Sequence, residues 1–424
     1  MEILIFLLGV LGGIFAGLVP GIGVFTTLVL LYPLLLELTL VQLLILYIPL
    51  ASISQFIGSV PALYFKIPGE STSFIATEYG HRLFMHGHYD LIPLTAIGSF
   101  VATILSAFII FSLPYLYESM FYYFISTKFI FFLILLTGAC LIATSKNNWL
   151  VSTAMIIAGM ILGNIGFNAS TGKFFGTFDN DWLSYGIPMF PLIVALYVLP
   201  NILKLDSNGV DTKAIDVAYI KSVVNVKRYV RAMFNGSVAG MIAGFVPIIG
   251  KIVGVSASRA LYKSSDKNSV IAAESSNNSS IFTAMIPLFL FGVPITLGEI
   301  LIYNVAETNY DLQNEFKNIL TTGLLPLIII ASGIFGIILS WPLARYCTNI
   351  FRLPSTVLKT LFLTVVLASL VYIGWIKHMV WYYILVVLVF LPAGHLLRNN
   401  DVIPLIFSFI FAKISMTIFE RIVI

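Results

Sequence analysis

The sequence predicts an all-α integral membrane protein of about 10–12 membrane segments, in two homologous halves that each carry a re-entrant helical hairpin. Composition, long apolar runs and an internal repeat lead to this prediction. Of the 424 residues, 59% are hydrophobic and 10% are charged, and the mean hydropathy is +1.00. Soluble domains are about 45–50% apolar and about 25% charged. Because no soluble core hides so much apolar surface, the chain is expected to lie in a bilayer.

Apolar runs of membrane-spanning length recur along the chain. A bilayer core about 30 Å thick requires about 20 apolar residues per helix. The runs that reach or approach this length are Ile3–Val19, Leu91–Leu113, Phe129–Ala143, Leu183–Leu203, Leu320–Leu343, Val357–Ile373, Val380–Leu397 and Val402–Phe419. No basic region precedes the first run, so we expect a retained helix there and not a cleaved signal peptide.

One polar stretch, residues 204–228, separates the two apolar halves. The bases in and beside it are Lys204, Lys213, Lys221, Lys227, Arg228 and Arg231. The positive-inside rule places such a stretch in the cytoplasm. The predicted domains are therefore a first transmembrane repeat at 1–203, a cytoplasmic basic connector at 204–228 and a second transmembrane repeat at 229–424. The alternative is a polar linker that is merely rich in charge.

An internal repeat relates the halves. The segment Gly13–Gly23 recurs as Gly240–Gly250, with Gly, Ala, Gly, Val, Pro, Ile and Gly at identical places. Two proline pairs follow at nearly the same shift. They are Pro61 with Pro68 and Pro287 with Pro294. The repeat therefore extends over whole domains.

Glycine and proline in these segments predict broken helices. Broken backbone at membrane depth occurs only where it is buried in protein or lines a wet cavity. Interrupted segments at matching places of two halves point to a solute site near the membrane midplane. For Gly13, Gly17, Gly240 and Gly244, an alternative is a small-residue face that packs helices together.

Polar but mostly uncharged segments accompany the breaks. They are Ile67–Ser73 in the first half and Glu274–Ser280 in the second. Their hydroxyls and amides can donate to an anion, while carbonyls at half-helix ends can coordinate Na⁺. Alternatively, each hydroxyl bonds its own backbone.

Three carboxylates need separate interpretation because burying a charge in a membrane is costly. Glu274 is expected beside the Asn277–Asn278 pair at a turn, where cation coupling or helix capping suits it better than contact with an anion. Glu70 is the next candidate. Glu299, after the second hairpin, has either a similar part or an interfacial salt bridge.

Other functional classes find little support. The chain has no P-loop and no dinucleotide-binding motif, so neither nucleotide hydrolysis nor nucleic-acid binding is expected. Two cysteines suggest neither a disulfide framework nor a metal site. A membrane enzyme using Glu70 and Glu274 as an acid and base pair lacks a nucleophile or metal triad. His81, His86 and His88 lie with Arg82 in a polar loop, where a solvated surface is favoured over a metal site.

Several motifs together resemble a known family. They are Gly17–Gly23, Gly58-Ser59, Ile67-Pro68-Gly69, Thr77 and Gly80, then Gly166–Phe178 and Leu183–Ile187, then Glu274-Ser-Ser-Asn277-Asn278, and Phe411–Arg421. In this order they resemble the large membrane subunit of tripartite tricarboxylate transporters, the TctA family, whose own signature reads Glu-Ala-Ala-Asn-Asn where this chain has Glu274–Asn278.

The resemblance implies a permease subunit in the bacterial inner membrane that imports a small carboxylate by symport with Na⁺ or H⁺. It implies inverted halves, a small membrane subunit and a periplasmic solute-binding protein as partners besides the lipid, no cofactor and no enzyme activity; a homodimer stays open. The alternatives are a transporter of another solute class and a non-transporting scaffold.

The expected site residues combine the breaks with this resemblance. The substrate-binding candidates are Pro20, Gly21, Gly23, Gly58, Ser59, Pro68, Gly69, Ser71, Thr72, Asn277, Asn278, Pro294 and Thr296. The cation-coupling candidates are Glu274, Asn277, Asn278 and Gly250. The chain departs from the family at Ile57, Ile248 and Ile295, where glycines are usual. Loss of glycine narrows the room for close backbone approach, so the second half-site is expected to differ in substrate fit or ion coupling.

Overall fold

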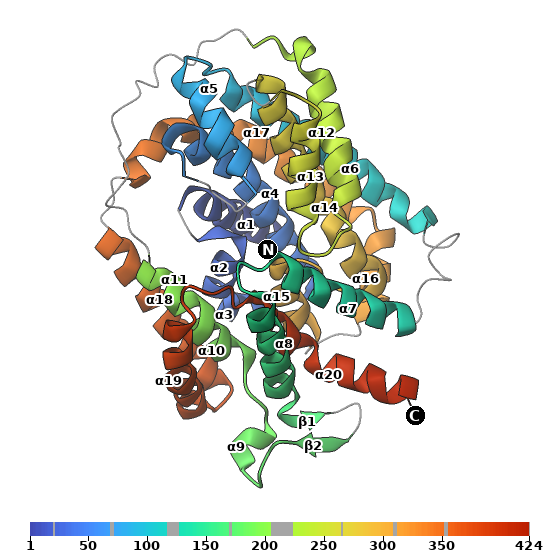
Figure 1. Ribbon diagram of the computed structural model, residues 1–424, viewed down its shortest axis with the longest axis vertical. Helices are drawn as coiled ribbons and strands as arrows, with labels where there is room; N and C mark the ends of the chain where they lie inside the picture. The colour runs from blue at the N-terminus through green and yellow to red at the C-terminus, as the bar shows by residue number, and fades with distance from the viewer. Residues whose placement is uncertain are drawn as a thin grey trace. The chain divides into compact units, whose positions relative to one another are not determined.

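Helices make up almost all the regular structure in the computed structural model of this chain (Figure 1). The structure describes residues 1–19, 22–67, 72–116, 127–168, 172–204, 224–263, 266–307, 312–351 and 355–423. Within these ranges the chain forms 20 α-helices and one two-stranded hairpin. The predicted all-α class is confirmed.

Several helices have the length and composition of membrane spans. Among the described residues, three are long and apolar enough to cross a bilayer, namely Leu40–Phe65, Leu91–Tyr115 and Thr356–Ile376. Shorter apolar helices of 10–17 residues accompany them along the chain. The chain is therefore an all-α integral membrane protein, while the total of about 10–12 segments stays a prediction.

The chain divides into two compact units that interleave along the sequence. Unit 1 comprises Met1–Thr27, Leu38–Phe121 and Asp206–Ser355; unit 2 comprises Leu28–Glu37, Tyr122–Leu205 and Thr356–Ile424. Each unit draws on both sequence halves, so this division differs from the predicted repeats 1–203 and 229–424. The boundaries of those repeats and their inverted orientation stay predictions.

The helices of unit 1 are α1 (Glu2–Leu18), α4 (Leu40–Phe65), a π-helix (Ala76–Gly80), α5 (His81–Met85), α6 (Leu91–Leu116), a 3-10 helix (Val226–Arg228), α12 (Val230–Ala243), α13 (Gly250–Ala260), α14 (Lys267–Phe291), α15 (Leu297–Glu307), α16 (Leu312–Thr321) and α17 (Leu324–Phe351). Those of unit 2 are α3 (Tyr32–Leu35), α7 (Thr127–Thr144), α8 (Trp149–Asn164), α9 (Asp181–Ser184), α10 (Met189–Ile193), a π-helix (Val194–Val198), α11 (Leu199–Lys204), α19 (Val380–Leu396) and α20 (Ile403–Val423), with strands β1 (Gly166–Asn168) and β2 (Lys173–Phe175). Two helices, α2 (Gly23–Leu30) and α18 (Ser355–Ile376), cross the unit boundaries.

The central element of unit 1 is α14. It packs against α4, α6, α12, α13 and α16, and Figure 1 shows it among α6, α12 and α13. Every residue from Ser269 to Phe291 is buried. A helix buried on all sides is normally apolar all round, yet α14 contains the polar run Glu274–Ser280. Its polar side chains must therefore find partners inside the protein.

Two helix pairs in unit 1 pack in the same way. Gly9, Gly13 and Gly17 of α1 lie against the carbonyls of Leu46, Leu50 and Ser54 in α4, so that an added Cβ would collide with each. Gly236 and Gly240 of α12, with Gly244 directly after its end, lie likewise against the carbonyls of Ala272, Ser276 and Ser280 in α14. The small-residue packing given as the alternative for Gly13, Gly17, Gly240 and Gly244 is therefore what the structure shows, and it follows the sequence repeat.

The second members of these pairs also end alike. α4 ends at a left-handed cap on Lys66, and α14 ends at a left-handed cap on Gly292. Pro61 and Pro287 lie inside the two helices and do not break them. The helices end four residues after each proline, because a left-handed residue cannot continue a right-handed helix.

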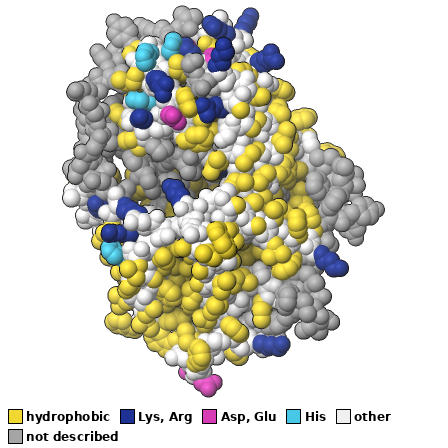
Figure 2. Space-filling model, viewed as in Figure 1, with side chains coloured by type: hydrophobic (Ala, Val, Ile, Leu, Met, Phe, Trp, Pro, Cys, Tyr) yellow, Lys and Arg dark blue, Asp and Glu magenta, His cyan; other side chains and the backbone are white. Residues whose placement is uncertain are grey.

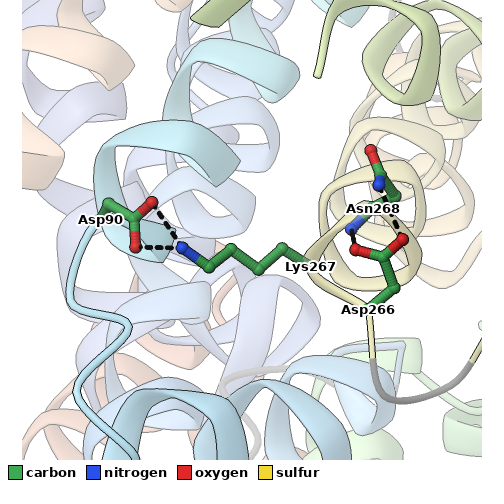
Figure 3. A network of polar contacts seen from close by, with 4 residues as sticks. All are labelled: Asp90, Asp266, Lys267 and Asn268. Carbon is green, nitrogen blue, oxygen red and sulfur yellow. Dashed lines mark hydrogen bonds and ion pairs between the residues drawn. The ribbon is translucent and has the colours of Figure 1, made fainter. Parts of the chain in front are cut away.

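An ion pair fixes the start of α14 to the start of α6. The Lys267 ammonium donates to both carboxylate oxygens of Asp90 at 2.7 Å. Asp266, beside it, caps α14 by accepting the Asn268 backbone N–H at 3.1 Å, and also accepts the Asn268 side-chain amide at 2.8 Å (Figure 3). Such partly buried, doubly bonded charge pairs hold a defined geometry better than exposed ones.

In unit 2, α20 packs on α7 and α8. Gly159 and Gly163 of α8 lie against the backbone of α20 at Leu405 and Phe409. The Asn147 side chain joins the ends of these helices, because it donates to the Asp401 carbonyl at 2.8 Å and accepts the Asp401 N–H at 2.9 Å. Close glycine packing is thus used in both units.

Candidate functional site

The polar run Glu274–Ser280 lies in the middle of α14. The expectation that Glu274 sits at a turn is wrong, because α14 is one continuous helix from Lys267 to Phe291. Glu274 is 1% exposed and the other six residues are 0% exposed. Local sequence could not show this, because the partners that make the run tolerable come from α4 and α6.

Two amides fix the polar run to its neighbours. The Asn277 side-chain amide donates to Gln55 Oε1 in α4 at 2.6 Å, and that of Asn278 donates to Ser99 Oγ in α6 at 2.7 Å. Successive helix residues turn by about 100°, so Glu274 lies between the directions of the two asparagines, one turn earlier. Its carboxylate is therefore directed toward the region between α4 and α6.

This region contains oxygen atoms without partners. Both carboxylate oxygens of Glu274, Oδ1 of Asn277 and Oδ1 of Asn278 are buried, and none has a hydrogen-bond partner among the described residues. Buried acceptors left unpaired are costly, and such exceptions require an explanation. Carboxylate and amide oxygens are the donors that hard cations prefer, whereas an anion would be repelled by Glu274. The donor set therefore fits a bound cation or a proton.

The serines of the run behave differently from the asparagines. Ser275, Ser279 and Ser280 each donate to a carbonyl one turn earlier in α14, at 2.8–3.2 Å. The alternative of self-bonded hydroxyls is therefore correct for these three. Of the four serines in the run, Ser276 is the one whose Oγ has no partner among the described residues.

Two helix breaks of the second half meet each other. We call residues 244–249, between α12 and α13, and residues 292–296, between α14 and α15, the paired helix breaks. The Ile248 N–H donates to the Ile295 carbonyl at 3.1 Å and joins them. Ile248 adopts φ 63°, a left-handed conformation that a β-branched side chain rarely takes. The chain thus retains a glycine-like backbone where the expected glycine is replaced by isoleucine.

Glu299 secures the start of α15. Its Oε2 accepts the backbone N–H groups of Ile295 and Thr296 at 2.9 and 3.1 Å, while the Glu299 N–H donates to Thr296 Oγ1 at 3.5 Å. This reciprocal pair is a capping box. Glu299 is 0% exposed, and its Oε1 has no partner among the described residues. One of the two roles expected for Glu299 was an interfacial salt bridge. Glu299 forms no such salt bridge within the described part of the chain.

The remaining predicted site residues are divided among several places. Pro20, Gly21, Pro68, Gly69 and Ser71 lie outside the described residues, as does Glu70. The meeting of the first-half hairpin tip with the second-half tip therefore stays a prediction.

Gly58 and Ser59 lie inside α4, where Ser59 Oγ donates to the Phe56 carbonyl at 2.9 Å and α1 approaches Gly58 at Gly17. Gly58 thus packs the helix pair, and neither residue stands at a break.

Other predicted site residues do lie at or near helix breaks. Gly23 and Gly250 begin α2 and α13. Pro294 and Thr296 belong to the paired helix breaks, and Thr296 acts in the capping box. Thr72 is buried, and its hydroxyl has no partner among the described residues.

The histidine-rich segment forms part of a basic end of unit 1. His81 begins the short helix α5, so the expectation of a loop is wrong there, and its Nδ1 lies 2.8 Å from the Leu63 carbonyl. Among the described residues no group of three or more His, Cys, Asp and Glu side chains could hold a metal ion. Figure 2 shows Lys, Arg and His side chains over α5 and α12, and the Arg259 guanidinium lies 4.2 Å from the centre of the Tyr79 ring.

The segment Gly166–Phe178 forms the hairpin of β1 and β2. Phe178 is 88% exposed and Tyr185 is 72% exposed. Residues 169–171 lie outside the described part. These aromatic side chains belong to a surface feature and not to the buried polar cluster.

Sequence reasoning missed Gln55 and Ser99, which hold the two asparagine side chains. Beyond the first turn of α4, where Gln42 lies, Gln55 is the one amide side chain in an apolar run, and this isolation is visible in the sequence. Ser99 gave no such signal.

Comparisons with known proteins agree with the motifs. The model of the Tripartite tricarboxylate transporter TctA family matches residues 3–407. A curated protein of Agrobacterium vitis, described as an uncharacterized 52.8 kDa protein in the TAR-I ttuC' 3' region, is 28% identical over 312 residues. That match covers 68% of this chain and 60% of the relative's length. No solved structure matches the chain.

Proposed function

Because this chain belongs to the tripartite tricarboxylate transporter TctA family, we propose that it is the large permease subunit of a binding-protein-dependent secondary transporter. It imports a small carboxylate by symport with a cation, Na⁺ in the first instance and H⁺ as the alternative. The observation that carries the proposal is the set of unpartnered oxygens of Glu274, Asn277 and Asn278 at the centre of unit 1.

The coupling cation binds between α14, α4 and α6. Glu274 supplies the negative charge, and the carbonyl oxygens of Asn277 and Asn278 supply further donors. Gln55 and Ser99 hold the two asparagine side chains in place. A cation here offsets a buried carboxylate, so cation occupancy alters the packing of three helices and can couple to substrate movement.

Substrate anion binds at the paired helix breaks, where the N-terminus of α13 favours negative charge. The start of α15 contributes less, because the N–H groups of Ile295 and Thr296 already donate to Glu299. Pro294 and Thr296 belong to the paired helix breaks, and Gly250 follows the first of the two breaks as the first residue of α13. The first-half candidates are Gly21 and Gly69. This assignment gives the coupling cation and the substrate anion separate binding sites.

The proposed partners are a small membrane subunit and a periplasmic solute-binding protein that delivers the carboxylate. The chain works in the bacterial inner membrane, with residues 204–228 on the cytoplasmic side. It carries out no covalent chemistry and requires no cofactor. A channel-like scaffold without accumulation is the competing function.

The test is uptake of labelled di- and tricarboxylates into vesicles that contain this chain with its small subunit and binding protein. We expect accumulation that requires an inward Na⁺ or H⁺ gradient. Glu274→Gln removes the charge at nearly constant size, so it should abolish gradient-driven accumulation. Ser280→Ala, on the same helix and self-bonded, should transport normally.

Two results would contradict the proposal. If no carboxylate accumulates with all partners present and the chain folded, the substrate class is wrong. If Glu274→Gln keeps the same gradient dependence as the original chain, the cation lies elsewhere.

A further inference from the structure

A buried amide of α4, that of Gln55, contacts the polar run of α14. Gln55 is 1% exposed, and its Oε1 accepts the Asn277 side-chain amide at 2.6 Å. The other end of the same amide, Nε2, donates to Ser54 Oγ at 3.2 Å. Both ends of the Gln55 amide are therefore engaged, one within α4 and one across to α14.

The Ser54 hydroxyl gives the Gln55 amide a fixed direction. Ser54 is 0% exposed, and its hydroxyl donates to the Ala51 carbonyl at 2.8 Å. A hydroxyl has one proton, and this proton is used by the carbonyl, so Ser54 Oγ faces Gln55 as an acceptor. An acceptor selects the N–H end of the amide. The oxygen end of Gln55 is therefore turned toward α14.

The same selection passes on to Asn277. Because an oxygen of Gln55 faces it, Asn277 presents its N–H group to α4 and keeps Oδ1, which has no partner among the described residues, for the cluster around Glu274. With the opposite rotation, the Asn277 N–H group would satisfy the Glu274 carboxylate and occupy the place of a cation. We call the series Ala51, Ser54, Gln55 and Asn277 the amide relay.

The partner of Asn278 exerts no such selection. The Asn278 amide donates to Ser99 Oγ at 2.7 Å. A hydroxyl rotates and acts as a donor or as an acceptor, so it accommodates either end of an amide. Ser99 therefore holds the Asn278 side chain in place, whereas Gln55 also decides which atom of Asn277 faces the cluster.

We propose that Gln55 is a positioning residue for the coupling cation. The amide relay turns the Asn277 oxygen toward Glu274, which makes the cluster a cation site instead of a closed pair of carboxylate and amide. This inference rests on the proposed function and assigns to Gln55, which acts through Asn277, control over the strength of cation binding. Binding of the substrate anion at the paired helix breaks does not depend on the relay.

The test measures the concentration of the driving cation, Na⁺ or H⁺, at half-maximal uptake in the complete three-component system. The KM of the carboxylate, succinate or citrate, is measured separately at saturating cation. Gln55→Leu nearly keeps the side-chain size but removes the acceptor that fixes Asn277, while Gln55→Glu keeps an acceptor oxygen at the same length. The matched control is Thr95→Val in α6, because the buried Thr95 hydroxyl donates to the Ile92 carbonyl of its own helix.

Gln55→Leu should raise the half-maximal cation concentration about tenfold or more, while the carboxylate KM changes by less than about twofold. Gln55→Glu should stay within about threefold of the original chain or bind the cation more tightly, and Thr95→Val should match the original chain. Ser99→Ala should raise the value less than Gln55→Leu does. Equal increases for Gln55→Leu and Gln55→Glu would show that Gln55 only fills space and would overturn the inference, as would no increase for Gln55→Leu.

Ser54→Ala gives an independent measure if Gln55→Leu does not fold. It removes the acceptor that directs the Gln55 amide and leaves Gln55 in place, so the half-maximal cation concentration should rise about threefold or more. An unchanged value would contradict the relay. If the original chain accumulates no carboxylate, the proposed function fails, whereas accumulation with unchanged cation dependence in these variants defeats this inference alone.

Discussion

At the residue scale, the unusual feature is a polar run inside a helix that is buried on every side. Asn277 and Asn278 satisfy their amide N–H groups through Gln55 and Ser99, but their oxygens and the Glu274 carboxylate stay unpaired within the described part. Buried unpaired acceptors cost about 1–3 kcal/mol each. This cost supports the proposal that a cation binds at the cluster.

Asn277→Ala should abolish uptake with little loss of expression. The substitution removes the bond to Gln55 and one oxygen of the cation cluster, while its effect on stability is about 1–3 kcal/mol. Uptake and the amount of folded protein in the membrane are measured in parallel, with Ser280→Ala as the control. Normal uptake by Asn277→Ala would remove Asn277 from the site. Gly69→Leu is expected to act likewise on the first-half tip, a prediction based on sequence.

At the element scale, matched helix pairs and their breaks organise unit 1. α1 against α4 and α12 against α14 use three glycines each, spaced one turn apart, so the backbones approach closely. The second pair leads into the paired helix breaks, where Ile248 is held at φ 63° by its bond to Ile295. Close packing thus positions a strained tip, as is common at functional sites.

Gly240→Ala should destabilise the protein by about 1–3 kcal/mol, because its Cβ would collide with the Ser276 carbonyl in α14. The measurement is the apparent melting temperature of purified protein in detergent. Gly138→Ala is the control, since its Cβ would meet only the Ile156 side chain at 3.9 Å. Equal melting temperatures for both variants would contradict the close approach.

Ile248→Gly should stabilise the tip by about 1–2 kcal/mol, because glycine adopts a left-handed backbone without the clash that isoleucine suffers. Ile249→Gly is the control. Ile249 lies at φ −92°, so glycine there brings only extra chain entropy and lowers stability. The apparent melting temperature should rise for the first variant and fall for the second. A fall for both would show that the Ile248 side chain outweighs its backbone strain.

At the scale of the whole molecule, the sequence repeat and the compact units divide the chain differently. The repeat is read along the sequence as 1–203 and 229–424, whereas unit 1 combines segments of both. In unit 1 the α1–α4 and α12–α14 pairs lie in one body, which brings Gln55 and Ser99 of the first half to Asn277 and Asn278 of the second. A cation bound there would contact elements from both repeats.

The sequence by itself determined the membrane class, the helical architecture, the repeat and the family motifs. These depend on composition and on local residues such as Pro247 and Gly292, whose effects on the backbone act within a few positions. Glu274, Asn277 and Asn278 could also be selected in advance, because polar residues in an apolar setting are visible in any sequence.

Only the tertiary structure decided where these residues lie and which atoms they contact. It placed Glu274 inside α14 instead of at a turn, and it gave Asn277 and Asn278 their partners in α4 and α6. Each partner lies tens to hundreds of positions away along the chain, so no local pattern specifies it. Packing of distant helices fixes which polar atoms are satisfied, and the atoms left unsatisfied mark where ligands are proposed to bind.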